Sequence, residues 1–180
     1  MTRQSVARTM GRTSTKGDPF NESMYKERND RWLTPLWIVE ALGAFDLDPA
    51  GAPGHPTAIE VWTPEEVGDG LSLPWHGRVW LNPPYGRESR AWVERLLAHG
   101  HGTALIPVAT GTKLWQEIVL PHADAILFWR HRINFLRRDG GVDEMVSPAA
   151  SALIAFGDGD AAALASSGLP GVTFTTKDMT

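Results

Sequence analysis

The stretch RVWLNPPY at residues 78–85 joins a strongly apolar segment to a stiff polar turn. Its first four residues have the composition of a buried β-strand, and the apolar run stops at Asn82. Pro83 and Pro84 have no backbone N–H and a fixed φ, and each pushes the preceding residue into an extended conformation. We therefore expect a rigid loop at a strand end, which offers the Asn82 side-chain oxygen and the Pro83 carbonyl as acceptors beside the ring of Tyr85.

Strand-like and helix-like segments alternate on both sides of this stretch. The expected strands are 45–48, 59–62, 78–81, 103–108, 125–129, 133–136 and 151–156, and the expected helices are 34–42, 90–99 and 113–120. Such alternation is typical of an α/β sheet with helices on both faces. Ligands bind such sheets beyond the carboxyl ends of the strands. Because the loops after Asp48 and after Leu81 both follow strands, we expect them to form one site.

The helix ends and the chain termini carry their own signals. Thr34 is expected to cap the first helix with Pro35 in its first turn, and Pro121 is expected to close the helix over 113–120. The 180 residues suit one domain. We expect a flexible polar tail over 1–28, one domain over 29–157, and a C-terminal tail over 158–180 with little regular structure.

Composition excludes several classes of protein. The chain has no cysteine, which rules out disulfides, Cys-ligated zinc and thiol catalysis. No apolar run approaches the roughly 20 residues of a membrane span, and the N-terminus lacks the apolar core of a signal peptide. We therefore expect a cytoplasmic protein that does not enter a membrane. The net charge of −4 means that any contact with nucleic acid depends on local basic patches.

The acceptors of the 82–85 loop suit chemistry on an exocyclic amine of a nucleic-acid base. Such an amine is a poor nucleophile because its lone pair is delocalised into the ring. Two acceptors, one for each N–H bond, would favour a more tetrahedral nitrogen with an available lone pair. The ring of Tyr85 could stack on the base, which is worth roughly 1–3 kcal/mol. No metal, acid or base is required if the methyl donor is already an activated sulfonium.

Four segments together resemble a known family. NPPY at 82–85 resembles the catalytic motif of amino-methyltransferases, and DPAGAPG at 48–54 resembles the cofactor loop of DNA methyltransferases. WLTP at 32–35 and DGLSLPW at 69–75 stand in the order found in the phage N-6-adenine DNA methyltransferase family, the small Dam-like enzymes. The resemblance covers about residues 29–157. It implies a Rossmann-like methyltransferase sheet in a single compact domain, S-adenosylmethionine as cofactor, and double-stranded DNA as partner.

The resemblance also implies the reaction, a methyl transfer to N6 of adenine. Its catalytic residues would be Asn82, Pro83, Pro84 and Tyr85, with the first two gripping the target amine and Tyr85 stacking on a base flipped out of the duplex. Protection of phage DNA from host restriction would be a suitable purpose. Cytosine N4, an RNA adenine or a glutamine amide remain alternative acceptors, and a silent DNA-binding protein with this fold remains an alternative to an enzyme.

The residues expected to line the cofactor site are Thr34, Pro35, Asp48, Pro49, Ala50 and Asp69. By resemblance, Asp48 lies near the amino-acid end of the cofactor, Thr34 and Pro35 lie by its carboxylate, and Asp69 accepts a hydrogen bond from its adenine amino group. Glu60 is a weaker candidate for the ribose hydroxyls. Only about 34 residues separate Asp48 from the NPPY loop, so we expect the early helices of the fold to be shortened.

Basic residues mark candidate contacts to DNA phosphates. The densest basic stretch contains Arg130, His131, Arg132, Arg137 and Arg138, and reads as a strand-turn-strand ribbon. An ordinary solvated surface is an equally good interpretation of that stretch. The further candidates are Arg87 and Arg90, just beyond Tyr85. The histidines, His55 included, show no spacing typical of a metal site and are expected to be ordinary loop residues.

Overall fold

The computed structural model describes residues 33–136, 145–147 and 149–175. The tail expected over 1–28, Arg137, Arg138 and the turn expected at 139–141 lie outside these residues. The described elements are α2 (Leu36–Glu40), β1 (Leu47–Asp48), β2 (Glu60–Val61), α3 (Pro64–Val67), β3 (Val79–Leu81), α4 (Ser89–His99), β4 (Gly102–Pro107), the π-helix η1 (Leu114–Val119), α5 (Leu120–His122), β5 (Ala125–Trp129), β6 (Asn134–Phe135), β7 (Met145–Val146), β8 (Ser151–Phe156), α6 (Asp158–Ser166) and β9 (Gly171–Thr175).

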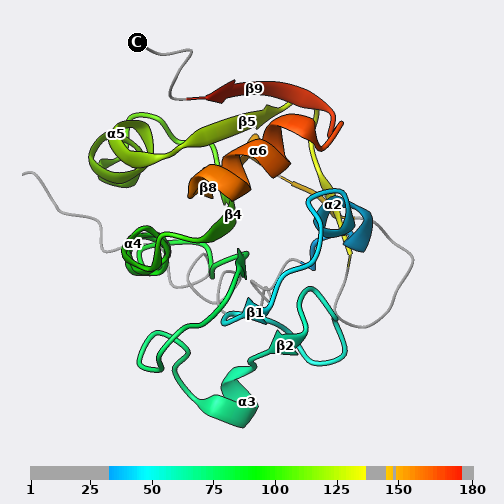
Figure 1. Cartoon of the computed structure of the whole chain (residues 1–180), viewed down its shortest axis with the longest axis vertical. Helices are drawn as coiled ribbons and strands as arrows, with labels where there is room; N and C mark the ends of the chain where they lie inside the picture. Colours follow the sequence, from blue (N-terminus) through cyan, green and yellow to red (C-terminus); the bar gives the residue numbers. More distant parts are fainter. Residues whose placement is uncertain (1–32, 137–144, 148, 176–180) are drawn as a thin grey trace, which may run out of the picture.

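Seven strands form one mixed sheet in the order β2-β1-β3-β4-β8-β5-β9 (Figure 1). The pairs β2–β1, β1–β3 and β3–β4 are parallel. β8 is antiparallel to both of its neighbours, and β9 is antiparallel to β5. This is the expected α/β sheet, and it is consistent with a Rossmann-like methyltransferase fold. The early helices are short as expected, because the described chain between β1 and β3 contains only the four-residue helix α3.

The strand order reverses at β1. The chain runs from β1 to β2 on one side and then returns to β3 on the other side, so Leu47 pairs with Glu60 and also with Val79. Where the connections after two neighbouring strands leave in opposite directions, a crevice opens at the carboxyl ends of those strands. The residues that follow β1 and β3 therefore border the same crevice, as the sequence predicted.

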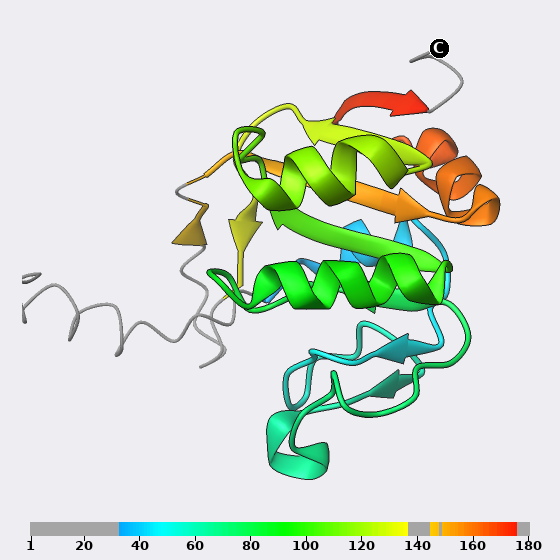
Figure 2. The ribbon, with the colours of Figure 1, turned by 90° about the vertical axis from the view of Figure 1, so that its left-hand side faces the viewer.

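Helices cover both faces of the sheet. In Figure 1, α4 and α5 lie on one side of the column of strands, and α2 and α6 lie on the other. Figure 2 shows α4 and the helix formed by η1 and α5 lying across the strands on the first of these faces. Strand residues alternate between the two layers: Val79 and Leu81 belong to the core under α4, whereas Trp80 belongs to the core under α2 and α6.

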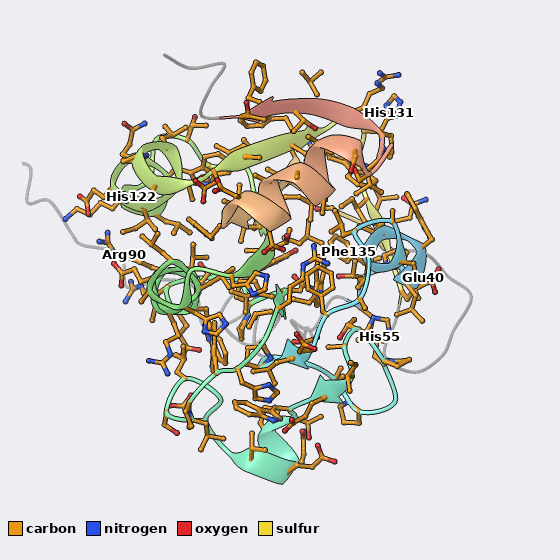
Figure 3. The ribbon with its side chains drawn as sticks, in the orientation of Figure 1. Glu40, His55, Arg90, His122, His131 and Phe135 are labelled. Atoms are coloured by element: carbon orange, nitrogen blue, oxygen red, sulfur yellow. The ribbon has the colours of Figure 1, made fainter. Side chains whose placement is uncertain are left out.

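A small second sheet lies beside the large one. β6 and β7 pair in antiparallel fashion, with Asn134 opposite Val146. Phe135 is fully buried and anchors this ribbon to the core (Figure 3). The ribbon lies toward the edge of the molecule where β4 ends and α4 begins (Figure 2). An isolated bridge between Leu33 and Leu136 joins it to the segment that precedes α2.

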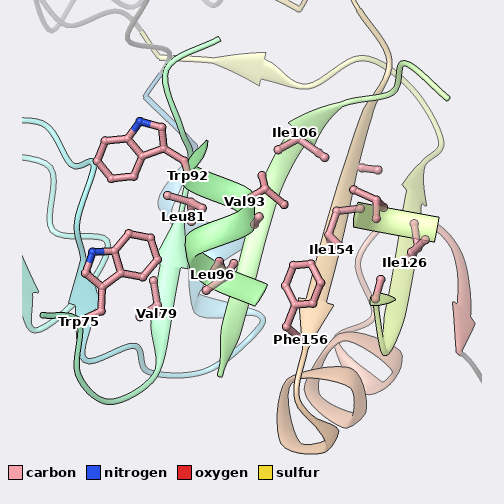
Figure 4. Packing of buried hydrophobic residues seen from close by; sticks show 14 of the residues in the cluster. Trp75, Val79, Leu81, Trp92, Val93, Leu96, Ile106, Ile126, Ile154 and Phe156 are labelled. Atoms are coloured by element: carbon pink, nitrogen blue, oxygen red, sulfur yellow. The ribbon is translucent and has the colours of Figure 1, made fainter. Parts of the chain in front are cut away.

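The core under α4 is built from large side chains on regular elements. Figure 4 shows Val93 and Leu96 of α4 beside core residues of β3, β4 and β8, which are neighbours in the sheet. At one end of this core the rings of Trp75 and Trp92 stack with centroids 6.1 Å apart. α4 begins at Ser89 and ends at His99, because Gly100 takes the left-handed conformation with φ of 76°. The amphipathic pattern therefore predicted this helix to within one residue.

Two predicted helix signals were wrong. Thr34 does not cap α2, because the helix begins at Leu36 and the Pro35 carbonyl accepts the Ile38 N–H at 2.9 Å. Pro121 does not close its helix either, because the helical chain continues through it to His122. A proline clashes with the carbonyl four residues before it in a regular α-helix. That carbonyl lies in the wider turns of η1, which accommodate the proline.

The expectation of little regular structure in the C-terminal tail, 158–180, was also wrong for its described part. α6 and β9 follow β8, and β9 completes the sheet by pairing with β5. The composition of α6 is mostly small, with a glycine in its first turn, so its pattern is weak. Tertiary contacts hold it instead, since Leu164 and Asp160 are fully buried. Asp160 accepts a hydrogen bond from Arg78 Nε at 2.7 Å.

We expect Asp160→Ala to lower the free energy of unfolding by about 3–5 kcal/mol, because it leaves the largely buried Arg78 guanidinium without its carboxylate. Asp158→Ala, which removes an exposed carboxylate from the same turn, is the matched control. Urea denaturation measures both variants. If the free energy of unfolding falls by the same small amount in both variants, the anchoring role of Asp160 is contradicted.

Candidate active site

A cavity of about 750 Å³ opens at the carboxyl ends of β1 and β3. This size lies within the range of roughly 300–1,000 Å³ that is usual for small-molecule sites. We call it the switch-point cavity. Its lining residues are Leu33, Thr34, Asp48, Pro49, Ala50, Gly51, Ala52, His55, Thr57, Pro64, Gly68, Asp69, Gly70, Leu71, Trp80, Asn82, Pro83, Pro84, Glu88, Ala91 and Trp92. The four sequence segments expected at the site, 32–35, 48–54, 69–75 and 82–85, thus all contribute to it.

Asp48 is a buried carboxylate at the end of β1, with 3% of its surface exposed. It accepts hydrogen bonds from the Ala50 backbone N–H at 3.1 Å and from the Thr57 hydroxyl. Burial raises the pKa of Asp48 to about 6, although both hydrogen bonds act to lower it. The carboxylate is therefore held in one orientation at the cavity wall and carries most of its negative charge at neutral pH.

Two loops meet closely across one wall of the cavity. A Cβ on Gly70 would lie 2.2 Å from the Pro49 carbonyl oxygen, and a Cβ on Gly51 would lie 2.2 Å from Val61 Cγ1. Only glycine permits such approaches. The Gly70 carbonyl also accepts the Trp75 indole N–H at 2.8 Å. The exposed Asp69 is thereby fixed against the loop that follows Asp48, and both carboxylates border one cavity.

Asn82 follows β3 directly and is tied to the segment that precedes α2. Its amide nitrogen donates to the Thr34 hydroxyl at 3.3 Å. This bond fixes the orientation of the Asn82 amide at the cavity wall. Thr34 itself is buried, with 1% of its surface exposed. Its hydroxyl thus positions Asn82 instead of capping a helix.

Tyr85 is more buried than expected for a ring that stacks on a base. Its hydroxyl is buried without a hydrogen-bond partner among the residues that the structure describes, and burial raises its pKa. The residue directly follows Pro84, which lines the switch-point cavity, but does not line the cavity itself. Stacking of Tyr85 on a base remains a prediction.

His55 is a cavity residue that sequence reasoning missed. Its ring donates to the Thr34 carbonyl, and its labelled side chain lies near the lower right of the molecule in Figure 3. Burial lowers the pKa of His55, which favours the neutral form of the ring. Its place in the Gly/Pro-rich loop that follows Asp48 at a strand end was the available signal. Thr57, in the same segment, was missed for the same reason.

Two residues expected at the cofactor, Pro35 and the weaker candidate Glu60, lie outside the cavity lining. Pro35 is buried at the start of α2 and does not line the cavity, although Thr34 does. Glu60 accepts hydrogen bonds from Trp62 Nε1 at 2.5 Å and from His76 Nε2 at 3.0 Å, and these bonds lower its pKa. The predicted contacts of Pro35 and Glu60 with a cofactor therefore stay predictions.

The candidate DNA-binding arginines differ in their surroundings. Arg87, Arg130 and Arg132 are exposed. Arg90, by contrast, bonds to Glu94 and to Glu117, each at 2.8 Å. Its charge is therefore partly offset, which makes it a weaker candidate for phosphate contact than the other three.

The basic ribbon adjoins the cavity through its backbone. The Leu136 N–H donates to the Leu33 carbonyl at 2.9 Å, and Leu33 lines the switch-point cavity. Arg130 and Arg132 lie in the segment between β5 and β6, which leads into this ribbon.

A model of the family described as DNA N-6-adenine-methyltransferase (Dam) matches residues 21–160. The chain belongs to the Dam family. Comparison with curated proteins and with solved structures gave no match. Membership of the Dam family implies an N6-adenine DNA methyltransferase, with DNA as substrate and S-adenosylmethionine as methyl donor.

The part of the chain that the structure describes contains neither a candidate membrane span nor a candidate metal site. No helix in the described ranges has both the length and the apolar character needed to cross a membrane. Within the same ranges, no three or more His, Asp or Glu side chains gather in a way that could hold a metal ion. His99 instead bonds to the Gly77 carbonyl at 2.8 Å.

The raised pKa of Asp48 predicts a pH dependence of stability. The ordinary value is 3.8, so the folded state binds this proton more tightly than the unfolded chain does. The resulting stability is fully present below pH 3.8 and is lost as the pH rises through about 6. Between these limits the wild type should lose about 3 kcal/mol more than Asp48→Asn, which cannot titrate.

Denaturant unfolding at several pH values measures this difference. Asp69→Asn, which alters an exposed carboxylate at the same cavity, serves as the control and should follow the wild type. Parallel pH profiles for Asp48→Asn and the wild type would contradict the buried, proton-binding state of Asp48.

Proposed function

We propose that this Dam-family chain methylates adenine N6 through the loop Asn82–Tyr85, acting on a base flipped out of the DNA duplex. One observation carries the proposal: Asp48 and Asn82 lie on opposite sides of the strand reversal and line the same cavity. A cofactor bound beside Asp48 would therefore lie next to the loop that receives the target amine.

The cavity suits S-adenosylmethionine in size and in chemistry. The donor is elongated, with a charged amino-acid end and an adenine end, and the cavity has a carboxylate on each of two loops, Asp48 and Asp69. In our proposal Pro49 and Ala50 line the cofactor site, Asp48 and Thr34 lie beside the amino-acid end, and Pro35 supports Thr34 from behind the cavity wall. Asp69 accepts a hydrogen bond from the adenine amino group. When bound, the cofactor supplies a methyl group activated by attachment to positively charged sulfur.

The residues of the 82–85 loop would prepare the amine. The Asn82 side-chain oxygen and the Pro83 carbonyl accept its two N–H bonds, which favours a tetrahedral nitrogen with an available lone pair. Pro84 fixes the backbone of the loop and so keeps the two acceptors in place. Orientation of this kind can supply roughly 7–11 kcal/mol of a reaction barrier.

Base flipping requires compensation for lost stacking. Extruding a base costs a few kcal/mol. Stacking on an aromatic ring returns roughly 1–3 kcal/mol. Tyr85 is the aromatic residue of the loop and lies next to the cavity-lining Pro84. In our proposal Tyr85 is the ring on which the flipped base stacks.

We expect Asn82→Ala to reduce methylation by at least about a hundredfold, because it removes an acceptor that orients and activates the amine. Affinity for the cofactor should fall only modestly. The assay incubates double-stranded DNA, RNA and protein in separate reactions with a methyl-labelled donor, and identifies the labelled nucleoside or amino acid after digestion. Labelled N6-methyl-2′-deoxyadenosine from DNA supports the proposal. Label in N4-methyl-2′-deoxycytidine, in RNA or in protein would reassign the acceptor, and unchanged turnover by Asn82→Ala would remove its catalytic role.

The basic ribbon yields a separate prediction for DNA binding. Replacing both Arg130 and Arg132 by alanine should weaken binding and reduce the slope of log K against log[salt] by up to about 2, since each phosphate contact contributes about 0.9. Replacing both by lysine keeps the charges and should preserve the slope. A slope unchanged in the alanine variant would make these residues ordinary surface.

A further inference from the structure

Two buried side-chain nitrogens of the switch-point cavity have no hydrogen-bond partner among the described residues. They are His55 Nε2 and Trp80 Nε1. Both residues line the cavity, one from the loop that follows β1 and the other from β3. Buried polar nitrogens in folded proteins nearly always have a partner, so each of these two indicates a missing one.

The chemistry of the two nitrogens is complementary. The His55 ring already donates to the Thr34 carbonyl, so its other nitrogen, Nε2, carries a lone pair and accepts. An indole nitrogen is a donor only, so Trp80 Nε1 must donate. Together they offer one acceptor and one donor to a group that bears both a hydrogen-bond donor and an acceptor.

We propose that His55 Nε2 and Trp80 Nε1 bind the zwitterionic amino-acid end of the cofactor, His55 accepting from its ammonium and Trp80 donating to its carboxylate. The inference rests on the proposed function and extends it to two residues with no assigned role. The negative charge of Asp48, in the same cavity, adds to the attraction for the ammonium.

The connection to Asn82 decides between the two ends of the cofactor. His55 bonds to the Thr34 backbone, and the Thr34 hydroxyl bonds to Asn82. His55 is therefore close to the residue at which the methyl group must be delivered. In the cofactor only a short carbon chain separates the sulfur from the amino-acid groups, whereas the ribose and the purine ring separate it from the adenine amino group.

Two ligands that differ in the amino-acid end provide the test. S-adenosylhomocysteine has this end, and 5′-methylthioadenosine lacks it. Calorimetry should show that His55→Leu and Trp80→Phe each weaken binding of S-adenosylhomocysteine by roughly 10-fold to 100-fold, the usual effect of losing a hydrogen bond to a charged group. Binding of 5′-methylthioadenosine should change less than about twofold in either variant, since this ligand makes neither bond.

Matched controls separate a lost contact from a damaged fold. Trp115→Phe also removes a buried indole N–H, which donates to the Pro107 carbonyl at 3.0 Å outside the cavity. His131→Leu removes an exposed histidine. Neither should affect S-adenosylhomocysteine binding. His55→Gln retains a side-chain acceptor and should restore part of the affinity that His55→Leu loses.

The NMR resonances of the indole N–H groups give a second readout, which does not depend on the His55→Leu variant. The chain has eight tryptophans, and the spectrum of Trp80→Phe identifies the signal of Trp80. S-adenosylhomocysteine should shift that signal downfield, and 5′-methylthioadenosine should leave it in place. A shift with both ligands would overturn the proposed placement.

The remaining outcomes distinguish this inference from the proposed function. If the wild type binds S-adenosylhomocysteine and both variants bind it equally well, the inference fails and the proposed function stands. If the variants lose affinity equally for both ligands, the inference also fails. Such a result would show that His55 and Trp80 have a structural role, for example a hydrogen bond between the two side chains. If the wild type binds neither ligand, the proposed function and the inference fail together.

Discussion

The parallel pairing of β1 with two neighbours, β2 and β3, is the constraint on which the site depends. Leu47 is bonded on both sides, so the carboxyl end of β1 lies in the middle of the parallel part of the sheet. The chain leaves β1 in one direction and returns on the other side, which opens the crevice. Asp48 and Asn82 are placed by this backbone arrangement, whatever the details of the loops that follow them.

The polar groups of the cavity reduce the stability of the fold. Asp48 is buried and its raised pKa reports an unfavourable environment for its charge. His55 and Trp80 add buried nitrogens without partners among the described residues. A sheet needs none of these groups in order to fold. Their position in one cavity supports our proposal that they bind the cofactor.

The sequence predicted the elements whose signals are local. The apolar strand before Asn82 and the amphipathic pattern of α4 each have a direct physical cause, and the structure confirms these two elements. Features that depend on distant contacts were missed. α6 is held by the buried Asp160, Pro121 is accommodated by a π-helix, and His55 gains its position from a bond to Thr34.

A crystal structure of the chain with S-adenosylhomocysteine would place the methyl donor relative to Asn82. We expect the ligand in the switch-point cavity, with its sulfur facing the loop that begins at Asn82 and its amino-acid end on the side of Asp48. A ligand bound outside this cavity, or inside it with the sulfur directed away from Asn82, would contradict this arrangement of donor and acceptor.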